Sequence, residues 1–247
     1  MGRPIIDGDA QAEHGPGGQV GGRTGALIDL AVFLGVVGAL FAVEAALALP
    51  QTWRGFAPIT GSVVACWLLL RRRGRGWRDV GLRRPARLWA LPVWCVVVFA
   101  VTMGLALAAQ PLLFALFDAE PDLSRFAGLY RNLPMLLAVL ASVWITAALF
   151  EELVYRGFVL DRLSGLLGGG GGATALAIVV QAVLFGALHF YQGPPGMVIT
   201  GLVGLIFGAA FVAMGRNLVA LIVVHGVIDT LSAIQFYLVD VTTLASG

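Results

Sequence analysis

Two adjacent glutamates, followed four residues later by an arginine, interrupt a stretch of the chain that is otherwise apolar. The sequence there is Glu151-Glu152-x-x-x-Arg156, and two later apolar stretches each contain one histidine, His189 and His225. Ionisable side chains are costly at membrane depth, so their presence there indicates a functional site. These residues are therefore the first candidates for chemistry.

Helical spacing separates the roles of the two glutamates. Positions i and i+4 share one face of a helix, so Glu152 and Arg156 are predicted to form an ion pair that serves as a structural clamp. Glu151 points elsewhere and has no adjacent cation in the sequence. It is the candidate carboxylate base, and Tyr155, one turn further on, is a candidate hydrogen-bond partner for it.

The same spacing recurs in two later helices. Phe185 and His189 are four residues apart on one stripe, and Asp229 follows His225 by one turn. A carboxylate in that position can hold the tautomer or the charge of an imidazole. Because polar stripes turn away from lipid, we expect them to meet in a shared pocket.

This set of residues supports the hydrolysis of a peptide bond. A carboxylate beside an imidazole can activate water, while a second imidazole with a polar partner stabilises the oxyanion. No serine or cysteine has a setting that would make it a nucleophile. Glu151, His189 and His225 could alternatively hold a divalent metal such as zinc with one open coordination position, although the His-Glu-x-x-His signature is absent.

Composition places these residues in a polytopic membrane protein. Hydrophobic residues make up 59% of the chain and charged residues 12%, against about 25% charged in soluble domains. Continuous apolar stretches indicate helices rather than a barrel. The predicted fold class is an all-α membrane helical bundle of seven helices, or eight if the third breaks at Pro111, with the spans 26–49, 56–70, 88–117, 134–163, 174–190, 197–214 and 217–238.

The remaining features concern the ends of the spans. Residues 1–25 are predicted to be a disordered cytoplasmic leader before a single transmembrane domain at 26–240. Asp29 and Glu44, near the ends of the first span, are expected to be exposed at the interface. Gly204-x-x-x-Gly208 would allow close approach of another helix. The glycine run at 168–172 is expected to be a flexible turn.

The distribution of arginine predicts how the chain is oriented in the membrane. Arginine is the residue to count, because the chain contains no lysine. The positive-inside rule places the connection between the second and third spans in the cytoplasm, together with the N-terminus. The arginines of this connection favour contact with the lipid bilayer and not with nucleic acid. They are Arg71, Arg72, Arg73, Arg75, Arg78, Arg83, Arg84 and Arg87, against Asp118, Glu120 and Asp122 after the third span.

Three motifs in this order resemble one protein family. The motifs are Glu151-Glu152-Leu153-Val154-Tyr155-Arg156-Gly157, then Phe185-Gly186-Ala187-Leu188-His189, then His225-Gly226-Val227-Ile228-Asp229. Together they look like the CPBP intramembrane proteases, which include type II CAAX prenyl endopeptidases and bacteriocin-processing or immunity (Abi-like) proteins. The resemblance covers the protease core at 134–232.

The resemblance implies roles for individual residues. Glu151 and His189 would activate the water, while His225 and Asp229 would assist the oxyanion or organise the pocket. Asp229 stands where many members have asparagine, and an aspartate needs a proton in order to donate. The glutamate-based mechanism makes a metal unnecessary, so no cofactor is favoured and zinc stays the alternative.

The sequence defines the substrate only as a class, a membrane-associated peptide or protein. The bias toward Ala, Gly and Arg without lysine indicates a bacterial source, for which prenylated substrates would be unexpected. Oligomeric state is undetermined. Two other readings stay open: a non-catalytic membrane scaffold or immunity factor of the same fold, and a proton-coupled transporter, which would show inverted repeats that the halves lack.

Overall fold

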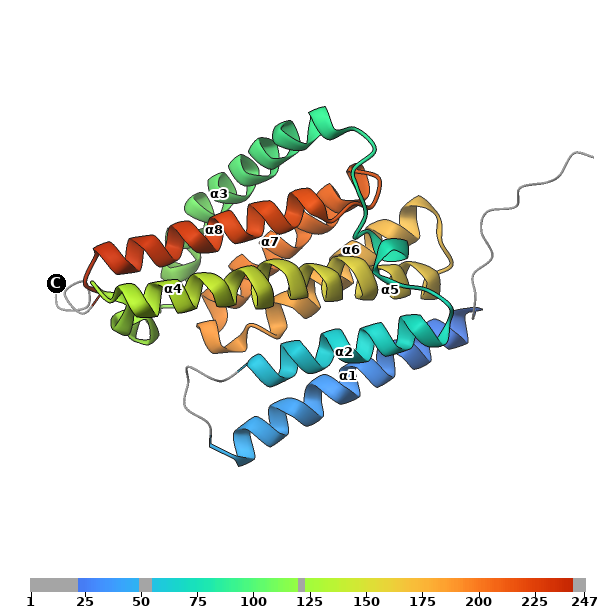
Figure 1. Cartoon of the computed structure of the whole chain (residues 1–247), viewed down its shortest axis with the longest axis horizontal. Helices are drawn as coiled ribbons and strands as arrows, with labels where there is room; N and C mark the ends of the chain where they lie inside the picture. The colour runs from blue at the N-terminus through green and yellow to red at the C-terminus, as the bar shows by residue number, and fades with distance from the viewer. Residues whose placement is uncertain (1–21, 49–54, 120–122, 242–247) are drawn as a thin grey trace, which may run out of the picture.

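The computed structural model describes residues 22–48, 55–119 and 123–241 (Figure 1). Within these residues the protein is helical, as the sequence predicts. Its longer elements are α1 (Gly22–Ala46), α2 (Phe56–Arg72), α3 (Leu91–Leu116), α4 (Leu133–Ser142), η5 (Val143–Val159), α5 (Leu160–Leu166), α6 (Gly170–Ala187), α7 (Gly193–Ala213) and α8 (Val219–Leu238). Short 3₁₀ turns connect several of them, among them η2 (Trp77–Val80), η3 (Leu88–Ala90), η4 (Ser124–Leu129) and η6 (Phe190–Gln192).

The seven predicted spans correspond to seven helical segments of the described chain, because α4, η5 and α5 run on as one helix over 133–166. Six of the seven are long and apolar enough to cross a membrane, and α2, with 17 residues, is the exception. The predicted alternative of a break in the third span is wrong, because α3 continues through Pro111 to Leu116. The chain is thus a multi-pass membrane protein.

The helix that carries the two glutamates lies at the centre of the bundle. In Figure 1, α1 and α2 lie along one side of the continuous segment α4–η5–α5, and α8 lies along the other. Helices α6 and α7 pack against each other behind it, and α3 contacts α7 and α8. The main core contains Phe33, Phe158, Phe207 and Phe211, all essentially inaccessible.

Large apolar side chains also cover the outside of the bundle, above all on α3. Four of its side chains are each at least two-thirds exposed on the protein surface: Val96, Leu107, Leu112 and Leu116. A soluble protein of this size rarely displays so much contiguous apolar surface. The outward face of α3 is therefore a surface for lipid tails.

Asp29 and Glu44 are buried, and the expectation that they lie exposed at the interface is wrong. Asp29 accepts a 2.7 Å hydrogen bond from Arg73 Nε and lies 2.9 Å from Arg162 Nε. Glu44 accepts hydrogen bonds from the backbone N–H groups at the start of α2, at 2.9 Å from Gly55 and 3.3 Å from Ala57. Both carboxylates therefore join helices: Asp29 ties α1 to α2 and α5, and Glu44 caps α2.

The small residues of α7 serve packing within the chain. A Cβ added at Gly204 would lie 3.1 Å from Ala182 Cα, and one at Gly208 would lie 3.0 Å from an Ile178 methyl group. The Gly204-x-x-x-Gly208 motif therefore brings α7 close to α6, as expected of such a motif.

The ends of the chain differ in part from expectation. Most of the predicted leader, residues 1–21, lies outside the described residues, while residues 22–25 are helical and begin α1. The glycine run also contributes to structure, because α6 begins at Gly170. Glu120 and Asp122 lie outside the described residues, and Asp118 is exposed just after α3.

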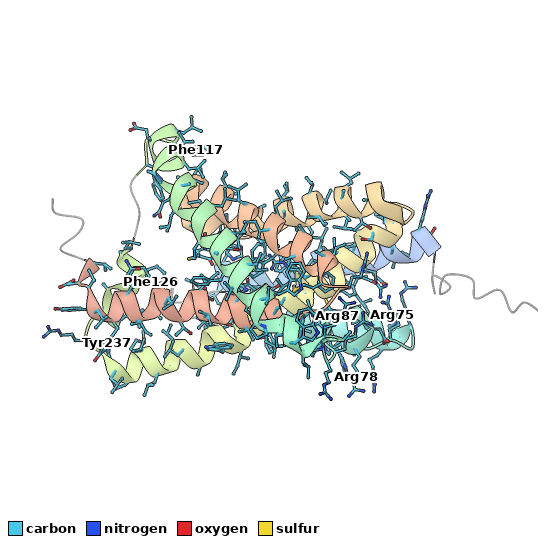
Figure 2. The ribbon with its side chains drawn as sticks, turned by 90° about the horizontal axis from the view of Figure 1, so that it is seen from above. Arg75, Arg78, Arg87, Phe117, Phe126 and Tyr237 are labelled. Carbon is cyan, nitrogen blue, oxygen red and sulfur yellow. The ribbon has the colours of Figure 1, made fainter. Side chains whose placement is uncertain are left out.

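Charge is concentrated at one end of the bundle. Figure 2 shows Arg75, Arg78 and Arg87 together near this end, and the aromatic residues Phe117, Phe126 and Tyr237 toward the opposite end. The arginine end contains the start of α1, the end of α2 and the turn between α7 and α8, joined by contacts such as Asn217 Nδ2 to Arg83 O at 2.7 Å. The predicted asymmetry in charge is thus present in three dimensions.

Candidate active site

The segment with both glutamates is a π-helix. Over Val143–Val159 the backbone bonds reach one residue further than in an α-helix, and the last turn closes from Leu160 N to Tyr155 O. The wide turns are not predicted by the sequence, in which the spacings are taken at α-helical angles. Such wide turns are rare and often occur at functional sites. Here the wide helix still brings residues four apart together, as the next contact shows.

Glu152 and Arg156 form the predicted ion pair, and both side chains are completely buried. Arg156 Nη1 donates to Glu152 Oε1 at 2.9 Å. The guanidinium carbon also lies 4.3 Å from the centre of the Phe185 ring and 5.1 Å from that of Phe207. The two rings supply cation–π attraction on faces where the arginine has no acceptor. This pair is therefore a clamp among η5, α6 and α7.

His225 binds the same carboxylate oxygen from the neighbouring helix. Its Nδ1 lies 2.9 Å from Glu152 Oε1, and a carboxylate oxygen can only accept. Nδ1 therefore carries the proton, and Nε2 faces the other way, 3.7 Å from Asp229 Oδ2. The predicted stack of His225 and Asp229 is present, but nothing in the sequence indicated the bond to Glu152.

Glu151 faces the second histidine. Glu151 Oε1 lies 3.9 Å from His189 Nε2, while His189 Nδ1 lies 2.7 Å from the carbonyl oxygen of Phe185. Because a carbonyl can only accept, Nδ1 is the donor, and in the neutral ring the lone pair of Nε2 points to the side of Glu151. The backbone of α6 thus fixes the tautomer of this imidazole.

The predicted span 174–190 places His189 inside a helix, but in the structure it lies outside one. Helix α6 ends at Ala187, and His189 precedes the short turn η6. Its ring packs edge-on against Phe185 with centroids 4.6 Å apart, and Phe185 packs in turn on Tyr155 at 4.8 Å. Tyr155 therefore supports the histidine through Phe185, whereas the sequence had suggested it as a partner for Glu151.

Burial divides the eight candidate residues into two groups. Glu152, Tyr155, Arg156 and Phe185 are buried, and they are the residues given supporting roles from the sequence. Glu151, His189, His225 and Asp229 are partly accessible, with side-chain exposures between 11% and 28%. The groups that would need to meet a substrate are therefore those that can be reached from outside the protein.

Two residues of the site's surroundings had no signal in the sequence. Phe207 lies on α7 and packs edge-on against His225, with ring centroids 5.8 Å apart. Trp144 lies over Gly226, where an added Cβ would come within 2.6 Å of its ring, and donates to Thr230 Oγ1 at 3.1 Å. An aromatic residue in an apolar helix is usually a packing residue, so only the fold could place these two beside the site.

The metal alternative is not supported by the arrangement of its ligands. Among residues 22–48, 55–119 and 123–241 no group of three His, Cys, Asp or Glu side chains is placed to hold a metal ion. His225 is directed at Glu152 and Asp229, while His189 faces Glu151. As placed, Glu151, His189 and His225 do not fit one shared ion, and we derive no step through a metal.

Comparison with protein families assigns the part of the chain that contains this site. Residues 133–231 match the family model described as type II CAAX prenyl endopeptidase Rce1-like. This segment is similar to the Rce1-like family. It starts with α4 and ends within α8, so it includes η5, α6 and α7 and all eight candidate residues. Searches of curated proteins and of solved structures found no match.

The match to the Rce1-like model agrees with the resemblance that the three motifs indicated. This match and the apolar helices together support a membrane protease that acts on a peptide or protein. Helices α1, α2 and α3 lie outside the matched residues.

Proposed function

We propose that the protein is an intramembrane endopeptidase of the glutamate type, in which Glu151 and His189 activate a water molecule. Its protease core would be residues 134–232 of a single membrane domain at 26–240. The observation that supports the proposal best is the approach of Glu151 Oε1 to His189 Nε2, 3.9 Å apart and both partly accessible, beside a buried glutamate that is already paired. A base must be reachable, and Glu151 is.

The separation of the two groups suits a bridging water. An oxygen placed about 2.8 Å from each atom satisfies ordinary hydrogen-bond geometry, and two atoms 3.9 Å apart leave room for it. The water would donate one hydrogen to Glu151 and the other to His189 Nε2. Its remaining lone pairs are then free to attack a carbonyl carbon.

Glu151 would accept and then return the one proton that is transferred in the reaction. As the water oxygen forms its bond to the peptide carbon, Glu151 takes one proton from the water. When the C–N bond breaks, the same carboxylic acid returns that proton to the departing amine. No covalent bond to the enzyme forms in this scheme.

His225 is the proposed stabiliser of the oxyanion. Its Nδ1 is held by Glu152, so a protonated ring presents its Nε2–H on the accessible side, toward Asp229. A charged donor fixed in a site of low polarity stabilises a developing oxyanion strongly. Asp229 would hold the charge of this ring or, when protonated, donate directly.

The substrate that we propose is a membrane-associated peptide or protein. The family's description names prenyl endopeptidases, so a farnesylated C-terminal peptide and an unmodified amphipathic peptide are both reasonable first substrates. The lack of lysine and the Ala, Gly and Arg bias favour a bacterial cell membrane and the unmodified class. The N-terminus and the arginine end of the bundle would lie in the cytoplasm.

The decisive experiment compares the wild type with Glu151→Gln. Both proteins would be reconstituted in vesicles with the two peptides, and products would be identified by mass spectrometry. Removal of the base should lower the rate about 10²- to 10⁴-fold. A second comparison, of new peptide termini in membranes of cells that express either protein, covers substrates that the two peptides do not represent.

The control for this experiment is a neighbouring exposed polar residue. Gln235→Ala changes an exposed side chain of α8, six residues after Asp229, without touching the proposed base or its imidazole. It should retain cleavage. If Glu151→Gln keeps the wild-type products at the wild-type rate, the glutamate-type mechanism is wrong and a scaffold or binding role takes its place.

A further inference from the structure

A second candidate site lies at the arginine end of the bundle. A pocket of about 530 Å³ is lined by Arg78, Leu82, Arg83, Arg84 and Val219. The three arginines are exposed, and they come from η2 and the chain that follows it, while Val219 is the first residue of α8. The nearest acid in sequence, Asp79, is engaged by the backbone N–H of Gly76 at 2.7 Å.

The walls of this pocket are fixed before any ligand binds. Leu218 N donates to Gly81 O at 3.1 Å, and Asn217 Nδ2 donates to Arg83 O at 2.7 Å. Arg83 Nη2 also donates to Gly215 O at 3.0 Å. These bonds attach the arginine segment to the turn between α7 and α8. A ligand would therefore bind with little loss of backbone freedom.

The arginines of the pocket directly precede an apolar span. The next apolar span begins at Leu88, only four residues after Arg84. Leu88 and Trp89 are exposed, Trp89 to 73%, and an exposed tryptophan at the start of a span typically lies in the interface. Figure 2 shows Arg78 at this same end, directed away from the helices.

We propose that this pocket binds the phosphate group of an anionic phospholipid headgroup. Arginine guanidinium groups match phosphate oxygens in a bidentate way, and three of the five lining residues are arginines. Free phosphate carries the same chemistry, but a pocket lined by Arg84, four residues before an apolar span, would meet lipid headgroups first. The proposal does not depend on the protease function, because it uses none of the residues of the candidate active site.

The test uses the full-length protein in an uncharged detergent. Thermal unfolding would be followed while phosphatidylglycerol, phosphatidylcholine or inorganic phosphate is titrated. The pocket variant is Arg78→Gln with Arg84→Gln, and Arg83 is kept because it bonds to Gly215. The matched control is Arg71→Gln with Arg72→Gln, which removes two charges from the same end of the bundle but from outside the pocket.

The expected result is selective. Phosphatidylglycerol should stabilise the wild type and the control variant, and its apparent affinity for the pocket variant should be about 30-fold weaker. Equal weakening in both variants would overturn the proposal, because it would show attraction by net charge alone. Equal stabilisation by phosphatidylcholine would overturn the need for an anionic lipid.

Inorganic phosphate distinguishes the two sources of the ligand. If phosphate alone gives the same stabilisation with the same dependence on the pocket arginines, the lipid assignment is overturned. Melting without ligand checks that each variant folds. Should the double variant fail to fold, the single variant Arg84→Gln replaces it, with an expected loss of about fivefold in the affinity for phosphatidylglycerol.

Discussion

His225 and Glu152 are joined across two helices by a 2.9 Å contact between Nδ1 and Oε1, although 73 residues separate them in the chain. The same oxygen accepts from Arg156, also at 2.9 Å. One buried carboxylate therefore organises a cation on its own helix and an imidazole on α8. Its neighbour Glu151 instead faces His189 at 3.9 Å, so the two adjacent glutamates have different surroundings.

Loss of charge at the two glutamates should affect stability to very different extents. Glu152→Gln leaves Arg156 buried without a counter-charge, so we expect the free energy of unfolding to fall by about 3–5 kcal/mol. Glu151→Gln changes a partly accessible group and should alter stability by no more than about 0.5 kcal/mol. Denaturant unfolding of both variants in the same detergent measures the difference. Similar losses in the two would contradict the assigned roles.

Asp229 offers a test of the oxyanion assignment. Asparagine has the same shape and an amide N–H that can donate without an added proton, so Asp229→Asn should keep the cleavage rate within about tenfold of the wild type. Asp229→Ala removes the polar group and should lower the rate by about 10²-fold or more. The measurement is kcat with a cleaved peptide. Full activity in the alanine variant would remove Asp229 from the site.

Close packing of α6 on α7 should be sensitive to a single methyl group. A Cβ at Gly186 would lie 2.5 Å from Met197 O and 3.0 Å from Gly201 Cα, both backbone atoms. Gly186→Ala should therefore cost about 1–3 kcal/mol of unfolding free energy. Gly104→Ala is the control, because a Cβ there meets no atom within 4 Å. Equal melting temperatures of the two variants would contradict the close packing of α6 on α7.

The buried carboxylate at the arginine end should be important for stability. Asp29→Asn leaves the guanidinium groups of Arg73 and Arg162 without their shared anion, and we expect a loss of about 3–5 kcal/mol. Asp118→Asn, at an exposed position after α3, should have almost no effect. Thermal melts of the two variants provide the comparison, and an unaffected Asp29 variant would show that the network adds nothing.

Local sequence spacing was sufficient to predict much of the site. The pairs Glu152–Arg156 and His225–Asp229 are four residues apart, and a helix places such residues together whatever surrounds it. The helices themselves follow from apolar length, and their predicted limits agree with the structure to within a few residues. Spacing and apolar length are properties of single segments, and both can be read directly from the sequence.

Contacts between different helices could not be predicted from the spacing within one segment. The bond between Glu152 and His225 depends on how η5 packs on α8, and the burial of Asp29 depends on arginines that lie 44 and 133 residues further on. The π-helical turns and the unbroken passage of α3 through Pro111 depend on the packing around them. No pattern in one apolar stretch distinguishes these outcomes.

The short helix α2 affects the thickness of membrane that the protein can occupy without strain. Its 17 residues extend about 26 Å at 1.5 Å per residue, less than the hydrocarbon thickness of about 30 Å. Hydrophobic mismatch of this sign is met by a locally thinned bilayer. Lipids with long acyl chains would strain the packing of α2 on η5, and through η5 the spacing of the site. The thickness of the host membrane thereby becomes a variable that bears on activity.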